Sequence, residues 1–324
     1  MLYPSIPINE EDRTREVIRA FTDSQIERLP IEDHILQVHR TEVRRPVMYF
    51  WSAHDFVLGL RDAIIGHAYL VDIGILHRDV SENNIVLGCH PKDTRGYNMD
   101  LDMAIPYRPQ PSSQPRDLQA ILDEAKLELK RKKAPITSQT SGPFKAGRTG
   151  TTPYMSIRVL LGRGHTHFDD MESFFYVLLL FFLSYEGPMS KDDLLQAHER
   201  GFTLQFGRPA HIHTWPPAFL PWSVEDTAKA ADYKRALFDL ERWDDYLNKI
   251  VKSIKDRWGH LHLRESIIEL IIDCWELFSI QNGPAKVPHQ QFVDVLNRWL
   301  EANKQPPQGC NHCPFNDANG KQMV

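Results

Sequence analysis

The chain has 324 residues, 42% of them hydrophobic and 25% charged, which is enough apolar material for a folded core and excludes a largely disordered chain. Its formal net charge of −5 gives it no global basic surface, so we expect no direct binding of nucleic acid. The longest apolar run, residues 174–183, is too short to cross a bilayer, and the four cysteines are too scattered for a disulfide framework, so we expect an intracellular protein, cytoplasmic or nuclear, with no membrane partner.

The first third of the chain combines a polar segment, one amphipathic helix and a small hairpin. Residues 1–45 are polar and acidic. In residues 54–73 apolar side chains recur at spacings of three and four, which predicts a helix with one buried face, and Gly74 stands where such a helix ends. Two strand-like runs, residues 84–87 and 97–100, are separated by a turn and predict a β-hairpin. The helices predicted within the polar segment are 11–21 and 24–37.

The composition changes twice beyond the hairpin. Residues 105–148 hold nine Lys or Arg against four Asp or Glu and are rich in Pro and Ser, which predicts a long exposed basic loop with one short helix at 118–129. Asp169 as an N-cap, with Glu172 three residues on, then predicts a helix over 170–185. That helix is apolar on all sides and therefore belongs in the centre of a domain. The further predicted helices are 225–257, 264–280 and 288–303.

The chemistry-bearing motif lies between the first helix and the hairpin. Residues 77–84 read H-R-D-V-S-E-N-N, which fits the catalytic loop of protein kinases. In phosphoryl transfer a carboxylate beside the acceptor hydroxyl orients it and takes its proton, a role that suits Asp79. An amide oxygen and a second carboxylate hold Mg²⁺ against the ATP phosphates, which suits Asn84 and Asp100. The hairpin between them brings both metal ligands to one edge.

The alternative interpretation is a chance H-R-D in a turn, with His77 as an ordinary core residue. The strand context, the downstream Asp100, the stretch G-T-T-P-Y-M-S at 150–156 and the apolar helix beyond it argue against that interpretation.

These pieces resemble the fungal-type protein kinase family, a branch of the eukaryotic protein kinase-like fold. The resemblance covers residues 46–185, and more weakly the chain to about 303. It implies an α+β, protein kinase-like fold, with a predominantly α-helical C-lobe and a small β-hairpin that carries the catalytic and metal residues. The resembling segments are GILHRDVSENNIVLG (74–88), MDLDMA (99–104), GTTPYMS (150–156) and HFDDMESFFYVLL (167–179).

The resemblance also implies a domain layout and roles for individual residues. We expect a C-lobe at 46–303 with an activation-type loop at 105–148, a partial N-lobe remnant or extension at 1–45, and a flexible tail at 304–324. We expect ATP and Mg²⁺ as cofactors and a protein as substrate. The implied site residues are Asp79 as proton acceptor, Arg78 as partner for a phosphate on the loop, Thr151 as a residue that bonds near the catalytic Asp, Asn84 and Asp100 as nucleotide and metal ligands, and Asp170 as an anchor under the catalytic loop.

Three positions depart from the kinase pattern. Many kinases have Lys two residues after the catalytic Asp, and here Ser81 removes that cation. Asp102 replaces the Gly of Asp-Phe-Gly and limits backbone freedom there. Where an Ala-Pro-Glu is expected the chain has Ser-Ile-Arg, so a Glu that would brace the loop is replaced by Arg158, which reverses the charge.

The sequence before the motif leaves two interpretations open. The first glycine is Gly59 and the first lysine is Lys92, so neither a Gly-rich phosphate loop nor an upstream phosphate-pairing Lys precedes the catalytic loop. Only 76 residues precede His77, and we expect the N-lobe to be incomplete. The chain is then either a fragment of a longer kinase or a degenerate kinase.

Three functions follow from these observations. The first is a kinase acting on protein Ser/Thr hydroxyls with ATP and Mg²⁺, supported by the intact Asp79, Asn84 and Asp100. The second is a pseudokinase or C-lobe fragment that acts as a binding module without turnover, supported by the missing upstream Lys and Gly loop. The third, a small-molecule kinase of the same fold, is disfavoured by Arg78 and the GTTPYM segment, because a small acceptor needs no peptide platform.

The lesser features have ordinary interpretations. The basic run 130–133 is interpreted as a solvated face, with a nuclear-import or docking patch as the alternative. Cys310, His312 and Cys313 offer only three soft ligands, so a flexible tail is favoured over a zinc site. Cys274 is interpreted as a core residue. The histidines interpreted as capping or surface residues, not metal ligands, are His165 and His167.

Overall fold

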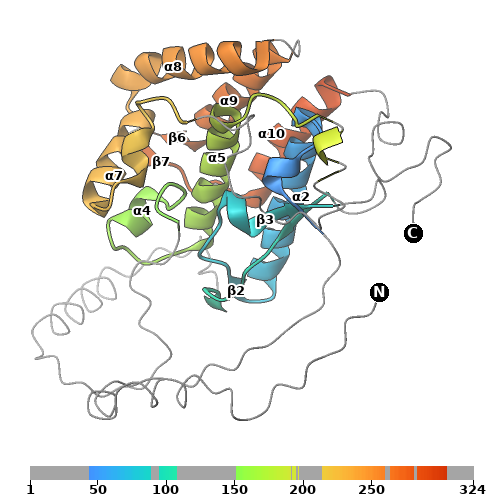
Figure 1. Cartoon of the computed structure of the whole chain (residues 1–324). Coiled ribbons are helices and arrows are strands. Elements are labelled where there is room, and N and C mark those ends of the chain that lie inside the picture. Colours follow the sequence, from blue (N-terminus) through green and yellow to red (C-terminus); the bar gives the residue numbers. More distant parts are fainter. Residues whose placement is uncertain are drawn as a thin grey trace, which may run out of the picture. The chain divides into compact units, whose positions relative to one another are not determined.

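One helix that is apolar on every side organises the rest of the structure, a computed structural model (Figure 1). Every side chain of α5 (His167–Ser184) from Asp169 to Ser184 is buried. Figure 1 shows it in the middle of the other helices, as the all-apolar run predicted. The helices that pack directly on it are α2 (Ala53–Asp72), α4 (Ile157–Leu160), α8 (Leu240–Trp258) and α9 (Arg264–Phe278).

The start of α5 differs from the sequence prediction. Thr166 is the N-cap, and Asp169, which was predicted to be the cap, is the third residue of the helix. Its carboxylate accepts the Thr166 N–H at 2.8 Å and completes a capping box. The helix therefore begins at His167, three residues before the predicted 170.

The structure describes residues 44–88, 95–107, 151–190, 192–194, 196, 214–259, 263–280 and 283–304. These residues belong to one structural unit, Arg44–Val324. Several sequence predictions lie outside the described residues, namely the helices at 11–21, 24–37 and 118–129, the basic loop from 108 to 148 with its run at 130–133, the three-ligand group at 310–313 and the tail from 305.

The helix predicted at 54–73 is confirmed as α2. Its N-cap is Ser52, whose hydroxyl accepts the Asp55 N–H at 3.0 Å. Gly74 follows the end of the helix with φ of +87°, a left-handed conformation that glycine adopts without strain. The buried face of α2 packs on α5, where the rings of Phe56 and Phe181 stack, and on α10 (His289–Ala302).

The predicted hairpin is confirmed and carries a third strand. β3 (Ile85–Leu87) and β4 (Gly96–Asn98) pair antiparallel, and β1 (Arg45–Pro46) pairs antiparallel with the other edge of β3. Two further two-stranded antiparallel pairs complete an α+β structure that is mostly helical, as predicted. They are β2 (Ile75–Leu76) with β5 (Ile105–Pro106), and β6 (Ser279–Ile280) with β7 (Gly283–Pro284).

A pair of glycines lets the hairpin lie directly on α2. A Cβ atom on Gly96 of β4 would stand 1.7 Å from the carbonyl oxygen of Gly59 in α2, a distance that no side chain can occupy. Close backbone approach of this kind requires glycine. The hairpin position relative to α2 is thus fixed by main-chain contact.

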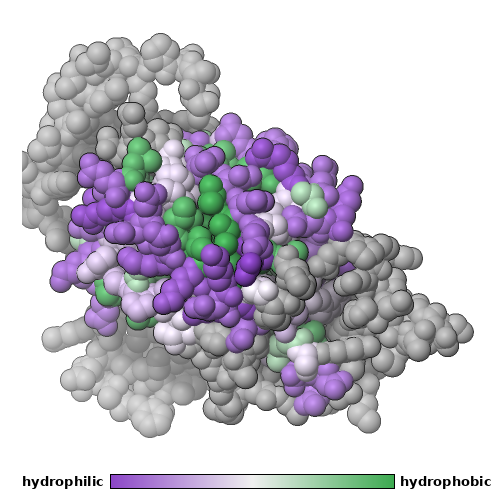
Figure 2. Space-filling view, turned by 90° about the horizontal axis from the view of Figure 1, so that it is seen from above, coloured by the Kyte–Doolittle hydropathy of each residue, from purple (hydrophilic) through white to green (hydrophobic). Residues whose placement is uncertain are grey.

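The helix predicted at 225–257 is two helices. α7 (Thr227–Arg235) ends in a short 3-10 turn, η6 (Ala236–Phe238), before α8 begins at Leu240. Asp239 caps α8 by accepting the Glu241 N–H at 3.0 Å, and this cap requires a non-helical residue there. Seen from above, the described surface is mostly hydrophilic, with one apolar area near the middle of the view (Figure 2).

The remaining predicted helices match α9 and α10 closely. Cys274 in α9 is fully buried, which confirms its interpretation as core. Within the ranges described above, no helix is both long and apolar enough to cross a bilayer. The short 3-10 elements not yet named are η3 (Val47–Tyr49), η4 (Glu82–Asn84) and η5 (Leu220–Ser223).

Candidate functional site

The structure brings Asp79, Asn84 and Thr151 together. The Asn84 amide donates to the main-chain oxygen of Asp79 at 2.8 Å and to its carboxylate Oδ2 at 2.9 Å. The other carboxylate oxygen, Oδ1, accepts the Thr151 N–H at 3.1 Å. The Asp79 side chain is therefore held by its own loop on one side and by the segment that leads into α4 on the other.

Asp100 lies at the open end of the same hairpin. The Met99 N–H donates to the Asn84 carbonyl at 2.8 Å. Asp100 follows Met99 directly and therefore lies near Asn84 in space. Its carboxylate is exposed and accepts the Asp102 N–H at 3.3 Å. The backbone of Asp100 has φ of +59°, a left-handed conformation that is rare outside glycine and is found at functional sites.

Arg78 shares this left-handed conformation, with φ of +73°. Its main-chain N–H donates to Asp170 Oδ2 in α5 at 3.2 Å, so a buried carboxylate supports the strained residue next to Asp79. In the guanidinium group, Nε is buried and has no hydrogen-bond partner among the described residues.

Asp170 joins the segment around Arg78 to two histidines. His67 Nε2 bonds to Oδ2 at 3.0 Å and His165 Nε2 bonds to Oδ1 at 2.8 Å. Burial alone raises the pKa of Asp170, but the hydrogen bonds from His165 and His67 outweigh it and hold the pKa well below its usual range. The carboxylate is therefore charged, and the loop around Arg78 is anchored to it as predicted.

Two further histidines extend this network, and sequence reasoning did not foresee it. His67 Nδ1 bonds to His289 Nε2 of α10 at 2.8 Å, and Tyr107 OH bonds to His167 Nδ1 at 2.8 Å. Burial lowers the pKa of His289 to about 3, and the neighbouring His67 and His167 act in the same direction. The one sequence signal was His67 itself, a polar residue on the apolar face of the predicted helix 54–73.

His77 links the loop to the hairpin. Its ring is fully buried, with Nε2 bonded to the Met99 carbonyl at 3.0 Å and Nδ1 accepting the Asp79 N–H at 3.3 Å. Burial lowers its pKa, although Asp170 acts to raise it. A neutral His77 thus ties Asp79 to the residue before Asp100.

Glu82 ties the same loop to the segment after Thr151. Its carboxylate accepts the hydroxyl of Tyr154 at 3.2 Å and that of Tyr185 at the end of α5. Burial raises the pKa of Glu82, while both hydroxyl bonds act to lower it. Residues 77–84 are therefore fixed to both the hairpin and the segment 151–157.

The donor chemistry at the hairpin edge fits a hard cation. The Asn84 amide nitrogen is used by Asp79, which leaves its side-chain oxygen to face other groups, and Asp100 offers an exposed carboxylate. Mg²⁺ prefers oxygen ligands and takes few of them from protein. No group of three or more His, Cys, Asp or Glu that could hold a metal ion occurs in the part of the chain that the structure describes, so at this edge the protein would supply only these two ligands.

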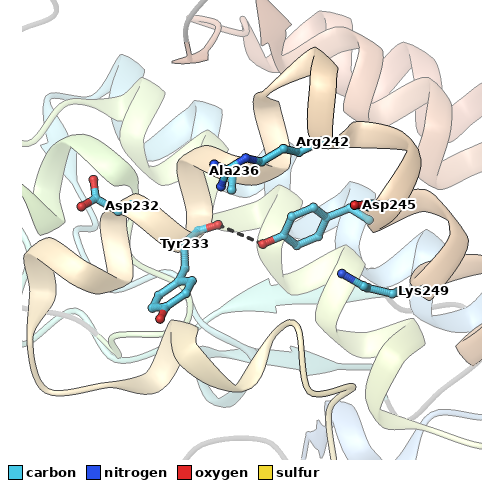
Figure 3. A pocket seen from close by; sticks show the side chains of 7 residues that line it. Asp232, Tyr233, Ala236, Arg242, Asp245 and Lys249 are labelled. Carbon is cyan, nitrogen blue, oxygen red and sulfur yellow. Dashed lines mark hydrogen bonds between the residues drawn. The ribbon is translucent and has the colours of Figure 1, made fainter.

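A pocket of about 450 Å³ lies between α7 and α8, away from these residues (Figure 3). Two of its lining residues are joined by a hydrogen bond, in which Tyr246 OH donates to the Tyr233 carbonyl at 3.4 Å. None of the predicted site residues lines it. The lining residues are Asp232, Tyr233, Ala236, Arg242, Asp245, Tyr246 and Lys249.

The loop-and-hairpin arrangement has a counterpart among known families. The family model described as fungal protein kinase matches residues 8–182, more than half of the chain. The chain belongs to the fungal protein kinase family, and this membership implies a kinase-like fold. The match includes most of residues 1–45, which the sequence analysis had set apart, and it ends at 182, short of the weaker resemblance to 303.

Proposed function

We propose that this chain is a protein kinase that moves the γ-phosphate of ATP to Ser or Thr hydroxyls of a protein substrate, with residues 46–303 as its C-lobe. The observation that carries the proposal is the fixed carboxylate of Asp79, held by Asn84 and by the Thr151 N–H. Membership of the fungal protein kinase family supports the class of reaction.

Asp79 is proposed as the base. Each of its carboxylate oxygens accepts one hydrogen bond and keeps a lone pair for an acceptor hydroxyl. A base held in this way orients the hydroxyl oxygen toward the γ-phosphate and takes its proton as the new bond forms. Thr151 acts through its main-chain N–H, which fixes the carboxylate plane.

Asn84 and Asp100 are proposed to hold Mg²⁺ through their side-chain oxygens. When bound with ATP, the ion would neutralise charge on the transferred phosphate. Arg78 is proposed as the partner of a phosphate on the loop, because its buried Nε has no partner among the described residues. Ser81, fully buried two residues after Asp79, supplies no cation to this site.

The test is transfer of radiolabelled γ-phosphate from Mg-ATP to a histone mixture and to the chain itself. We expect transfer by the unchanged protein, and a loss of about 10²- to 10⁴-fold in Asp79→Asn, the size typical of a removed general base. Asp100→Asn should lose transfer and weaken Mg-dependent nucleotide binding. Transfer that survives both substitutions would overturn the proposal.

A binding module without turnover is the second candidate. It is favoured by two departures from the kinase pattern, Ser81 in place of a lysine two residues after Asp79 and Arg158 in place of a glutamate. Nucleotide binding measured by calorimetry separates the two candidates. Binding of Mg-ATP without transfer in any assay supports the module, whereas transfer abolished by Asp79→Asn excludes it.

A further inference from the structure

The segment 151–157 is held in place although the expected acidic brace is missing. Arg158 stands where a kinase has that glutamate; its side chain is 42% exposed, and its Nε lies 3.5 Å from Asp169 Oδ1. The arginine side of this pair faces solvent, which screens its charge, so a contact at that distance contributes little. The segment nevertheless keeps a tight turn, in which the Tyr154 N–H donates to the Thr151 carbonyl at 2.8 Å.

The turn is filled by the ammonium group of Lys234, from α7. Its Nζ donates to the carbonyl oxygens of Thr152 at 3.2 Å, Pro153 at 2.8 Å and Met155 at 2.5 Å. These bonds use all three donors of a lysine. The lysine side chain is fully buried, so its amino group depends on these three main-chain acceptors for its hydrogen bonds.

Aromatic rings enclose the ammonium group on its other sides. Nζ lies 4.2 Å from the centre of the Tyr176 ring and 5.3 Å from that of Trp222, both within cation–π range. The Tyr176 hydroxyl donates to Glu172 Oε1 at 2.5 Å, and the same oxygen accepts the Ile157 N–H at 2.7 Å. Lys234 thus holds residues 152–155, and Glu172 holds residue 157.

We propose that Lys234 is a positioning residue for the acceptor hydroxyl. This inference rests on the proposed kinase function. Lys234 bonds to the carbonyl of Thr152, and the preceding residue, Thr151, donates its N–H to Asp79. The lysine therefore fixes, one residue away, the donor that orients the proposed base.

The first test compares Lys234→Met with Lys229→Met. Methionine is similar in length but lacks the three donors, while Lys229 lies on the same helix, is 71% exposed and pairs only weakly with Asp226. Amide hydrogen exchange should become at least tenfold faster in residues 151–157 of Lys234→Met, with α5 and α8 unchanged. Lys229→Met should exchange as the unchanged protein does. Unchanged exchange in 151–157 of Lys234→Met would overturn the clamp.

The second test is kinetic. Lys234→Met should lower kcat for phosphate transfer to a histone mixture by about tenfold to a hundredfold, the effect of misplacing a reacting group by about 1 Å. The Kd for Mg-ATP should stay within twofold, because the metal ligands are on another element. Faster local exchange with unchanged kcat would overturn the positioning role.

A conservative variant keeps both tests decisive. Lys234→Gln retains two N–H donors on a shorter side chain, so its exchange and kcat should lie between those of the unchanged protein and Lys234→Met. If Lys234→Met does not fold, Lys234→Gln replaces it in both tests. Unchanged hydrogen exchange in residues 151–157 of Lys234→Gln would then show that Lys234 does not hold this segment. An unchanged protein without transfer would overturn the proposed function and the catalytic role of Lys234 together, whereas exchange alone would still decide whether the clamp exists.

Discussion

Two carboxylates that lie two residues apart in α5 each hold a different loop. Their hydrogen-bond partners differ, and so do their pKa values. Asp170 anchors the loop around Arg78 and is surrounded by His67 and His165. Glu172 anchors the segment after Thr151 and accepts from neutral donors, a tyrosine hydroxyl and a main-chain N–H. Both carboxyl groups are almost completely buried.

The difference in partners moves the two pKa values apart. The pKa of Asp170 lies well below its usual range, because two histidine hydrogen bonds outweigh its burial. Burial raises the pKa of Glu172 to about 7, although its hydrogen bonds act in the other direction. Equal burial therefore gives a permanently charged anchor in one case and an anchor that titrates near neutral pH in the other.

The largest expected effect comes from removing the charged anchor. Asp170→Ala leaves two histidines and a main-chain N–H without their buried acceptor, so we expect a loss of about 3–5 kcal/mol in the free energy of unfolding. The measurement is urea unfolding followed by tryptophan fluorescence at pH 7. As a control, Asp273→Ala removes a half-exposed carboxylate 3.9 Å from Arg298 and should lose less than about 1 kcal/mol. Equal losses of unfolding free energy in the two variants would show that the contacts between Asp170 and the histidines do not stabilise the fold.

The next effect concerns the pH dependence contributed by Glu172. Its folded pKa is raised from 4.5 to about 7, so its stabilising contribution is complete below pH 4.5 and is lost as the pH rises toward 7. Glu172→Gln keeps a carbonyl acceptor and cannot ionise. Between pH 4.5 and 7 the unchanged protein should lose about 3 kcal/mol relative to this variant. Parallel stability curves for the two proteins would contradict a raised pKa.

A smaller effect of opposite sign comes from the histidines around Asp170. The folded pKa of His289 is lowered to about 3, so below pH 6.5 the unfolded chain takes up a proton that the folded chain does not. Stability should fall as the pH drops, with His289 contributing up to about 2 kcal/mol at pH 5. His289→Gln should therefore lose less stability than the unchanged protein between pH 7 and pH 5. A variant that loses as much would place the acid sensitivity elsewhere.

The smallest expected effect tests the residue that stands in for the missing brace. Arg158→Ala removes a partly exposed contact with Asp169 and should lower the free energy of unfolding by less than about 1 kcal/mol. Thermal and urea unfolding beside Lys234→Met provide the comparison. If Arg158→Ala lowered the free energy of unfolding as much as Lys234→Met, then Arg158 itself would hold the segment 151–157.

The sequence was sufficient for the elements whose signals are local. The helix over 54–73 was predicted from apolar spacing and ends at Gly74 as expected, and the ten apolar residues from Phe174 made α5 a central helix. That Asp79 and Asn84 lie close together follows from a contiguous motif, whereas their roles in catalysis stay predictions. Asp169 was misplaced at the helix start because a threonine three residues earlier could serve equally well as a cap.

The parts that were missed depend on partners far away in the chain. Strand β1 is two residues long and exists only because β3 lies beside it, about forty residues later. Lys234 bonds to main-chain oxygens about eighty residues before it. Every residue has such an oxygen, so the sequence does not show which ones the lysine contacts. The break before α8 was hidden because no glycine or proline stands at residues 236–239, where the chain forms a 3-10 turn that buries Leu237 and Phe238.

The main-chain character of the Lys234 contacts has a consequence for how this protein can diverge. Every amino acid carries a main-chain carbonyl oxygen, so Lys234 can donate hydrogen bonds to residues 152, 153 and 155 whatever their side chains are. Substitutions at the partly exposed positions 152 and 153 can therefore change the surface while the hydrogen bonds from Lys234 stay in place. The residue that secures this segment lies on another helix, so the segment can change in side chains at 152 and 153 without a matching change in Lys234.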